Sequence, residues 1–319
     1  MKKLFLFLAF SLALFTGCSG KKDSQEFHIG FQLYSVRQDL SRDFYGTLKK
    51  VSEMGYEGVE FFNEYSGNTP AQVRQICDEL GLVIFSNHVP FADMMSDIDK
   101  VIEESRILGV EYIAFPYMDV PSRPGVNPEQ FKETVKAIGE IGAKVKAAGF
   151  QLLYHNHDFE FALLPDGTVG HDYIFSSNSP ENVQVELDVC WADYAGFPVE
   201  GIVRKYAGRI PVLHMKDYYQ EGKLDSDPYA LIGTENQGGG NRSGGRGRFE
   251  FRPLGKGVMD FAPIIEAART SGVKWMCVEQ DDPSAGAKDR FEGPAISIQY
   301  LRENFYIRHY AALSLLQKK

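Results

Sequence analysis

Four apolar segments of this chain end in side chains that could bind a metal ion. The first is residues 151–158, where an apolar strand containing Leu153 leads directly into His155 and His157. Side chains two residues apart share one face of a strand, so both imidazoles should point the same way as Leu153. Three other segments end similarly, at 185–188, 212–216 and 276–279. Imidazoles and carboxylates are costly to bury unpaired, so we expect one shared site; four unrelated buried polar groups are the alternative.

The expected site takes one donor from each segment: His155, Asp188, His214 and Glu279. Two imidazoles and two carboxylates suit a divalent Mn, Co, Zn, Fe or Mg ion, with no thiolate to select otherwise. Open positions on the ion could take two neighbouring oxygens of a sugar, so that the ion polarises a carbonyl while a base removes the adjacent proton. Glu279 and His157 are the candidate bases, and Lys216 could stabilise an oxyanion.

Other residues near strand ends are candidate substrate-binding groups, namely Arg37, Glu60, His88 and Trp191. Trp191 could stack on a sugar or simply pack at the rim of the fold. Glu186 shares a strand face with Asp188 but lies deeper, which favours a partner of a ligand over a ligand. We expect His28, His171 and His309 at the surface. Cys77, in a helix, and Cys190 and Cys277, in strands, are expected to be small buried groups.

A repeated layout would position these residues: an amphipathic helix ends at a glycine and an apolar strand follows at once. The glycines are Gly55, Gly81, Gly109, Gly149 and Gly272. Glycine just past a helix end supplies the left-handed residue that stops the helix. Ser96 and Asn127 are predicted helix starts.

Eight strands are predicted, mostly with one helix between successive strands: Ile29–Leu33, Gly58–Phe62, Val83–Asn87, Tyr112–Pro116, Gln151–His155, Val183–Asp188, Ile210–His214 and Trp275–Glu279. This alternation predicts a parallel sheet buried on both faces, and eight units in one chain of this length predict a single (β/α)8 TIM barrel. An open doubly wound sheet is the alternative, but we find no GxGxxG-type turn near the start. Barrel enzymes work at the carboxyl ends of their strands, where the candidate residues fall.

The first segment has the pattern of an export signal. Lys2 and Lys3 precede an apolar run to Phe15 that is too short to span a bilayer comfortably. Residues 16–19 (Thr-Gly-Cys-Ser) resemble a bacterial lipobox, which implies cleavage before Cys18 and lipid attachment to its sulfur; ordinary secretion is the alternative. We therefore expect a signal peptide at 1–17, a tether at 18–26 and the barrel at 27–319, in an exported protein attached to the membrane through its lipid anchor only.

The charge and one unusual segment limit the partners. The net charge is −9, and loss of Lys2 and Lys3 would make the protein more acidic, which argues against binding to nucleic acid. The glycine-rich segment 233–248 contains Arg242, Arg246 and Arg248, so it could cradle a phosphate, but it lacks the Lys-Ser/Thr ending of a P-loop. We expect it to be a mobile lid or a disordered insertion.

Six stretches together resemble the xylose isomerase-like barrels, the sugar phosphate isomerases/epimerases: residues 30–37, 154–161, 186–188, 214–217, 254–257 and 278–281. The resemblance implies a metal held by one residue from each of strands five to eight. Members that epimerise ketoses commonly have Glu, Asp, His and Glu there, and the first Glu is also one of two opposed proton-transfer groups. His155 stands in its place, and Trp191 stands where many members have a substrate-binding His. These departures argue against a two-base C3 epimerase.

We therefore expect a metal-dependent isomerase or epimerase that acts on a small-molecule carbohydrate. A lyase, hydratase or dehydratase acting on 3-keto glycosides or keto-inositols is one alternative. A carbohydrate-binding lipoprotein without turnover is another, and an abasic-site endonuclease would need more metal ligands and a basic face. Export favours neutral carbohydrates or their 3-keto forms over sugar phosphates.

Overall fold

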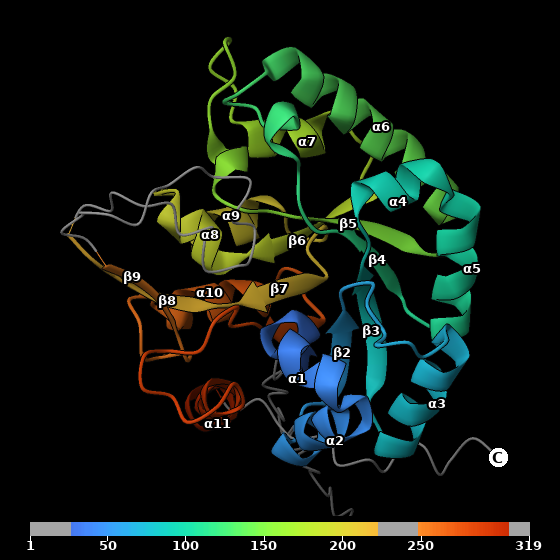
Figure 1. Ribbon diagram of the computed structural model, residues 1–319. Coiled ribbons are helices and arrows are strands. Elements are labelled where there is room, and N and C mark those ends of the chain that lie inside the picture. Colours follow the sequence, from blue (N-terminus) through green and yellow to red (C-terminus); the bar gives the residue numbers. More distant parts are fainter. Residues whose placement is uncertain (1–26, 223–247, 306–319) are drawn as a thin grey trace, which may run out of the picture.

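The computed structural model describes residues 27–222 and 248–305, which form a closed barrel of eight parallel strands surrounded by helices (Figure 1). The barrel strands are β1 (His28–Gln32), β2 (Gly58–Phe61), β3 (Val83–His88), β4 (Tyr112–Phe115), β5 (Gln151–His155), β6 (Val183–Asp188), β7 (Val212–Met215) and β10 (Trp275–Val278). The barrel closes where β1 pairs with β10. The predicted (β/α)8 barrel is confirmed, and each predicted strand end lies within two residues of the observed one.

Helices connect the strands: α1 (Arg37–Arg42), α2 (Phe44–Met54), α3 (Pro70–Leu80), α4 (Phe91–Ser96), α5 (Ile98–Leu108), α6 (Pro128–Ala147), α7 (Gly170–Ser176), α8 (Val189–Tyr194), α9 (Val199–Lys205), α10 (Phe261–Ala268) and α11 (Glu292–Phe305), with 3-10 turns η1 (Leu33–Val36), η2 (Val120–Ser122) and η3 (Phe159–Phe161). The five predicted helix-stopping glycines all have left-handed φ angles, between 70° and 94°. This conformation costs glycine nothing sterically, so each helix can end and the chain can turn into the next strand.

One predicted helix start is confirmed and one is wrong. Asn127 caps α6, because its side chain accepts a hydrogen bond from the backbone N–H of Gln130. Ser96 instead ends α4, where its hydroxyl bonds back to a carbonyl of that helix. The cap of α5 is the next residue, Asp97, whose carboxylate accepts from the backbone N–H of Lys100.

An apolar layer fills the amino-terminal half of the barrel interior. It contains Phe85, Tyr112, Ala114, Leu153, Val212, Trp275 and Cys277. The Trp275 and Phe85 rings lie parallel with their centroids 4.3 Å apart. A Cβ on Gly30 would lie 2.5 Å from the Phe85 ring, so this strand position must be a glycine for the ring pair to fit. The layer closes one end of the barrel and leaves the other end to polar side chains.

An antiparallel hairpin interrupts the helix–strand alternation after β7. It consists of β8 (Asp217–Glu221) and β9 (Arg248–Arg252), and Figure 1 shows it extending away from the barrel. The Asp217 carboxylate accepts hydrogen bonds from the backbone N–H groups of Gly255, Gly257 and Met259, which fixes the loop after β9. Arg248, the last residue of the expected lid segment 233–248, begins β9; the rest of that segment, the signal peptide, the tether and His309 lie outside the described residues.

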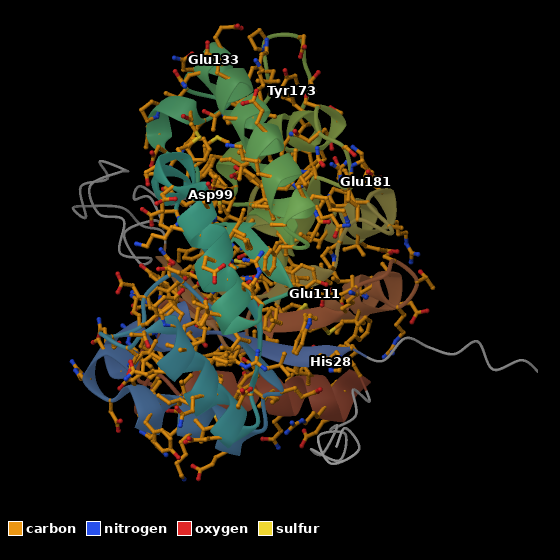
Figure 2. The ribbon with its side chains drawn as sticks, turned by 90° about the vertical axis from the view of Figure 1, so that its right-hand side faces the viewer. His28, Asp99, Glu111, Glu133, Tyr173 and Glu181 are labelled. Atoms are coloured by element: carbon orange, nitrogen blue, oxygen red, sulfur yellow. The ribbon has the colours of Figure 1, made fainter. Side chains whose placement is uncertain are left out.

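Exposed acidic side chains occur on the outer helices, such as Asp99 of α5 and Glu133 of α6, and on the turns before β4 and β6. Figure 2 labels Asp99, Glu111, Glu133 and Glu181, and all four side chains are exposed. Among the described residues, we find no helix with both the length and the apolarity needed to cross a membrane.

Two predicted placements are wrong. Cys190 lies in α8 and not in a strand, because Asp188 ends β6 and at once caps the helix by accepting from the backbone N–H of Trp191. His171 is buried and not at the surface, with its ring parallel to that of Phe161 at a centroid distance of 4.8 Å. Cys77 in α3, Cys277 in β10 and the exposed His28 lie as predicted.

The burial of His171 should make folding stability depend on pH. Burial lowers the pKa of His171 to about 3, although Asp172 opposes the shift. An unfolded histidine titrates near 6.5, so the unfolded chain binds the proton first and stability falls as the pH drops from about 6.5 towards 3. The free energy of unfolding should fall between pH 7.5 and pH 5 in the unaltered protein. In His171→Phe we expect this fall to be about 2 kcal/mol smaller, as measured by urea denaturation. Equal pH dependence in both proteins would contradict this expectation.

Candidate metal centre

Polar side chains occupy the carboxyl-terminal half of the barrel interior. Strand register sets their neighbours: His155 on β5 lies opposite Glu186 on β6, and Asp188 on β6 lies opposite His214 on β7. Glu186 and Asp188 are two residues apart and therefore face the same side of their strand. All four side chains are buried, so each charge or ring nitrogen must find its partner inside the barrel.

The four residues expected to bind the metal converge. His155, Asp188, His214 and Glu279 each offer one ligand atom, and these atoms lie within 4.8 Å of one another. We call these four residues the outer donor set. Glu279 directly follows β10, so the set draws one side chain from the end of each of the last four barrel strands.

The geometry of the outer donor set fits a divalent cation. Asp188 Oδ1 accepts from the Trp191 backbone, whereas the buried Oδ2 has no hydrogen-bond partner among the described residues. His155 Nε2 lies 3.9 Å from that Oδ2, too far for a hydrogen bond. Two donors that bind one ion at 2.0–2.2 Å can lie up to about 4.2 Å apart. A shared cation would therefore satisfy both atoms.

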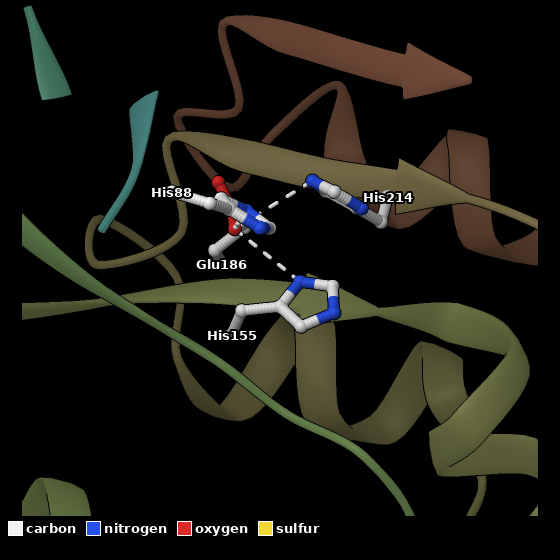
Figure 3. Close-up of side chains that lie close together, drawn as sticks. All are labelled: His88, His155, Glu186 and His214. Atoms are coloured by element: carbon white, nitrogen blue, oxygen red, sulfur yellow. Dashed lines mark hydrogen bonds and ion pairs between the residues drawn. The ribbon is translucent and has the colours of Figure 1, made fainter. Parts of the chain in front are cut away.

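Deeper in the barrel, Glu60 and Glu186 contact the same imidazoles. We call this pair the inner carboxylates. His88 Nε2 lies 2.6 Å from Glu186 Oε2 and 3.0 Å from Glu60 Oε1. Figure 3 shows His88, His155 and His214 grouped around Glu186. A carboxylate oxygen of Glu186 also lies within 4.8 Å of nitrogens of His88, His155 and His214, a group that could itself hold an ion, so the expectation that Glu186 is a partner of a ligand and not a ligand stays a prediction.

Burial and neighbouring charges shift the ionisation of His88, Glu60 and Glu186 in different directions. Although burial opposes the shift, Glu60 and Glu186 raise the pKa of His88 to about 10, so His88 is a cation at neutral pH. Burial raises the pKa of Glu60, but His88 and His214 outweigh it and hold that pKa well below its usual value. Burial, with Glu60 nearby, raises the pKa of Glu186 to about 7.

Lys216, the expected oxyanion contact, lies at the edge of the outer donor set. Its Nζ is 3.1 Å from Glu279 Oε2 and 3.5 Å from Asp188 Oδ2, and it also forms an ion pair with Asp281. Burial opposes its charge, but these carboxylates raise the pKa of Lys216 well above its usual value. The ammonium group is thus held in place next to the candidate metal ligands.

His157, the candidate base, is positioned by the turn after β5. The buried Glu160 carboxylate accepts from the backbone N–H of His157 at 2.8 Å and from the Tyr154 hydroxyl at 2.7 Å. The His157 ring lies parallel to Phe159 and edge-on to Tyr117. Side-chain packing and backbone hydrogen bonding therefore hold this imidazole in one orientation.

A cavity of about 240 Å³ opens over these groups. It is lined by Tyr34, Phe62, His88, Pro90, Pro116, Tyr117, His155, His157, Lys216, Glu279 and Asp281. Its walls are thus aromatic rings and prolines, and the candidate metal ligands, base and lysine form its polar end. A mostly apolar lining with a few convergent polar groups is typical of a small-molecule site.

Of the four residues expected to bind substrate, His88 lines the cavity; the other three lie outside the cavity lining of the described residues. Glu60 contacts His88 and His214 inside the barrel. Arg37 donates to the carbonyls of Tyr34 and Asp281 and so supports the cavity wall. Trp191 is fully buried with its ring parallel to Phe249 and edge-on to Phe251, which agrees with the packing alternative.

Two residues in or near β10, Asp281 and Cys277, make contacts in the site that were not predicted from the sequence. Asp281 lines the cavity and pairs with Lys216; its position two residues after Glu279 on the same strand end was the available signal. The thiol of Cys277 lies next to an inner carboxylate, with its Sγ 3.9 Å from Glu60 Oε1. Burial raises the pKa of Cys277, so the thiol stays protonated and is a poor metal ligand.

The fold and the site agree with a match to known proteins. Residues 48–304 match the family described as the xylose isomerase-like TIM barrel. This match spans most of the chain, and the chain belongs to this family.

Individual relatives are distant. The chain is similar to an inosose dehydratase from Lacticaseibacillus casei, at 23% identity over 265 residues that cover 76% of this chain and 84% of the relative. It is similar in structure to a sugar phosphate isomerase/epimerase from Parabacteroides distasonis ATCC 8503, with a TM-score of 0.69 and 22% identity over 88% of this chain and 100% of the other. The IolI protein, solved with a zinc atom, has a TM-score of 0.62 and 13% identity over 86% of this chain and 97% of the other. At these identities the structural matches show a shared fold.

The outer donor set predicts the effect of removing one ligand. In Asp188→Asn, an amide replaces the carboxylate whose Oδ2 would bind the ion, so we expect loss of bound metal with the barrel intact. Metal content measured by emission spectroscopy after dialysis, together with circular dichroism, tests this. Glu133→Gln on the exposed surface of α6 is the matched control. Full metal content in Asp188→Asn would count against the outer donor set.

Proposed function

We propose that this protein is a divalent-metal-dependent enzyme that removes a proton next to the carbonyl of a neutral sugar or keto-sugar, and so isomerises or epimerises it. One observation carries the proposal: a single cavity is lined by members of the outer donor set together with His157 and Lys216. Metal-dependent proton removal next to a carbonyl requires three kinds of group: ligands that hold the cation, a base, and a contact for the oxyanion.

Each residue has a role that follows from its contacts. The outer donor set would hold the ion, which when bound supplies a Lewis acid for the substrate carbonyl. His157 faces the cavity in a fixed orientation and would take the proton at a ring nitrogen. The Lys216 ammonium would stabilise the oxygen on which negative charge develops. Glu279 is engaged by His214 at 3.0 Å and by Lys216 at 3.1 Å, which favours a ligand over a base.

The lining of the cavity supports an uncharged substrate. The rings of Tyr34, Phe62 and Tyr117 offer flat apolar faces. Among the described lining residues, the cations Lys216 and His88 are both already paired with carboxylates. A phosphate group placed next to either cation would also lie close to the carboxylates paired with that cation. Those negative charges would repel the phosphate. A neutral carbohydrate of the size of one sugar ring suits this lining better.

Dehydration of a keto-sugar or keto-inositol is the second candidate, because relatives such as the one from Lacticaseibacillus casei are named inosose dehydratase. The contacts of His155 also favour it. One ring nitrogen of His155 faces Glu186 and the other faces Asp188, so this ring is not available as a second base opposite His157. A site with one base supports isomerisation or loss of water more readily than two-base epimerisation.

Hydrogen exchange in deuterated water tests the proposal. The Mn²⁺-loaded protein would be incubated with neutral ketoses, 3-keto glycosides and keto-inositols, and NMR would follow each carbon. We expect deuterium at one carbon beside the carbonyl of one substrate class. His157→Ala should slow the exchange by about 10² to 10⁴-fold, since the base is lost.

Glu133→Gln, on the exposed face of α6, is the control and should exchange at the rate of the unaltered protein. Formation of an unsaturated ketone with loss of water would instead establish the dehydratase. A metal-loaded protein that binds a sugar but exchanges no proton would overturn the proposal and indicate a carbohydrate-binding protein.

We also propose that the protein is exported and anchored through lipid on Cys18, on the basis of the lipobox-like residues 16–19 and the preceding apolar run. Labelled palmitate fed to bacteria that express the full chain should be incorporated into the protein. Cys18→Ser should lose the label and leave the membrane fraction. Cys77→Ser, which alters a buried cysteine of α3, should keep it. Label retained in Cys18→Ser would contradict the anchor.

A further inference from the structure

Two histidines of the outer donor set each have two ring nitrogens that face different groups. His214 Nδ1 lies 3.0 Å from Glu279 Oε2, and its Nε2 lies 2.7 Å from Glu60 Oε1. His155 Nε2 lies 3.9 Å from Asp188 Oδ2, and its Nδ1 lies 3.3 Å from Glu186 Oε2. A ring nitrogen that carries a proton cannot bind a metal. The position of the proton on each ring therefore decides on which side an ion is held.

The contacts of Glu60 place the His214 proton. Gln32 Oε1 accepts from the backbone N–H of Tyr34, so its Nε2 is the group that donates to Glu60 Oε1, at 2.7 Å. Glu60 Oε1 is thus an acceptor, and its short contact with His214 requires the proton on Nε2. The Nδ1 nitrogen of His214 is then left for the ion beside Glu279.

The contacts of His155 are longer than those of His214, and its Nδ1 has no hydrogen-bond partner among the described residues. Nδ1 is 3.3 Å from Glu186 Oε2, within ion-pair range, whereas Nε2 is 3.9 Å from Asp188 Oδ2, beyond hydrogen-bond range. The longer distance suits two donors that share one ion. If Nε2 binds the ion, the ring N–H of His155 lies on Nδ1, the nitrogen 3.3 Å from Glu186 Oε2.

His88 occupies the space between the inner carboxylates. Its Nε2 contacts Glu186 at 2.6 Å and Glu60 at 3.0 Å, and its ring lies nearly parallel to that of His214, with the centroids 5.4 Å apart. A single N–H on His88 Nε2 lies close enough to both oxygens to donate to either of them. His88 thereby keeps Glu60 and Glu186 together as acceptors for the two outer imidazoles.

We propose that Glu60 and Glu186, bridged by His88, are positioning residues that direct Nδ1 of His214 and Nε2 of His155 at a single ion in the outer donor set. The inference rests on the proposed function only for the presence of that ion. A carboxylate that accepts the second N–H of a metal-binding imidazole fixes the ring and makes its other nitrogen more basic. Glu60 acts through His214 and is not a substrate contact.

The protonated ring nitrogens can be observed directly. Zn²⁺ is the probe, added to the full chain labelled with ¹⁵N in its histidines, and long-range ¹H–¹⁵N NMR reports which nitrogen carries a proton. We expect protons on Nε2 of His214 and on Nδ1 of His155, with one zinc ion bound. A proton on Nδ1 of His214 or on Nε2 of His155 would overturn the inference. Two zinc ions per chain, with the Nε2 proton of His88 displaced, would also overturn it.

A substitution tests the positioning role separately. Glu60→Gln should weaken Zn²⁺ binding by about 10 to 100-fold in chelator competition, with the stoichiometry still one ion. Glu250→Gln makes the same change at another buried glutamate, which pairs with Arg248 and Arg252 on β9, and should leave Zn²⁺ affinity unchanged. Equal affinities in the two variants would overturn the positioning role. Failure of the unaltered chain to bind Zn²⁺ would overturn both this inference and the proposed function, whereas reversed nitrogens would overturn this inference alone.

Discussion

The pairing of opposite charges inside the barrel is the interaction on which the rest of this structure depends. Glu60, Glu186, Asp188 and Glu279 are all buried at the carboxyl-terminal end, and an unpaired buried ion would cost several kcal/mol. Their partners are three imidazoles and the Lys216 ammonium, each between 2.6 Å and 3.9 Å from a carboxylate oxygen. Because each of these four groups lies near at least two carboxylates, a change at one group alters the balance at several others.

The two halves of the barrel interior therefore have different physical roles. The apolar half, with the parallel Phe85 and Trp275 rings, is stabilised by packing and closes the amino-terminal end of the barrel. The polar half is stabilised by directed contacts that permit few arrangements. Strand register connects the two halves, since Leu153 in the apolar layer and His155 in the polar layer lie on the same face of β5.

Local patterns were sufficient for the elements of the fold. The glycine after each helix and the apolar run that follows predicted the strand positions, because both signals depend on residues close together in the chain. The wrong predictions arose where one local sequence pattern is compatible with more than one structure. Ser96 and Asp97 are both good caps, and the backbone conformation decided for Asp97. The polar ring of His171 suggested the surface, but packing against Phe161 buried it.

The sequence by itself determined the barrel, the strand ends and the residue types that meet at the carboxyl-terminal face, because these follow from periodicity and strand order. It did not determine which atoms meet. The contacts between Glu60 and His214 and between His88 and Glu186 join residues 154 and 98 positions apart. Such contacts depend on strand register and on side-chain rotamers, which only the closed barrel brings together. The tertiary structure alone therefore decided that Glu60 belongs to the ion network, that Trp191 is buried, and that Asp281 pairs with Lys216.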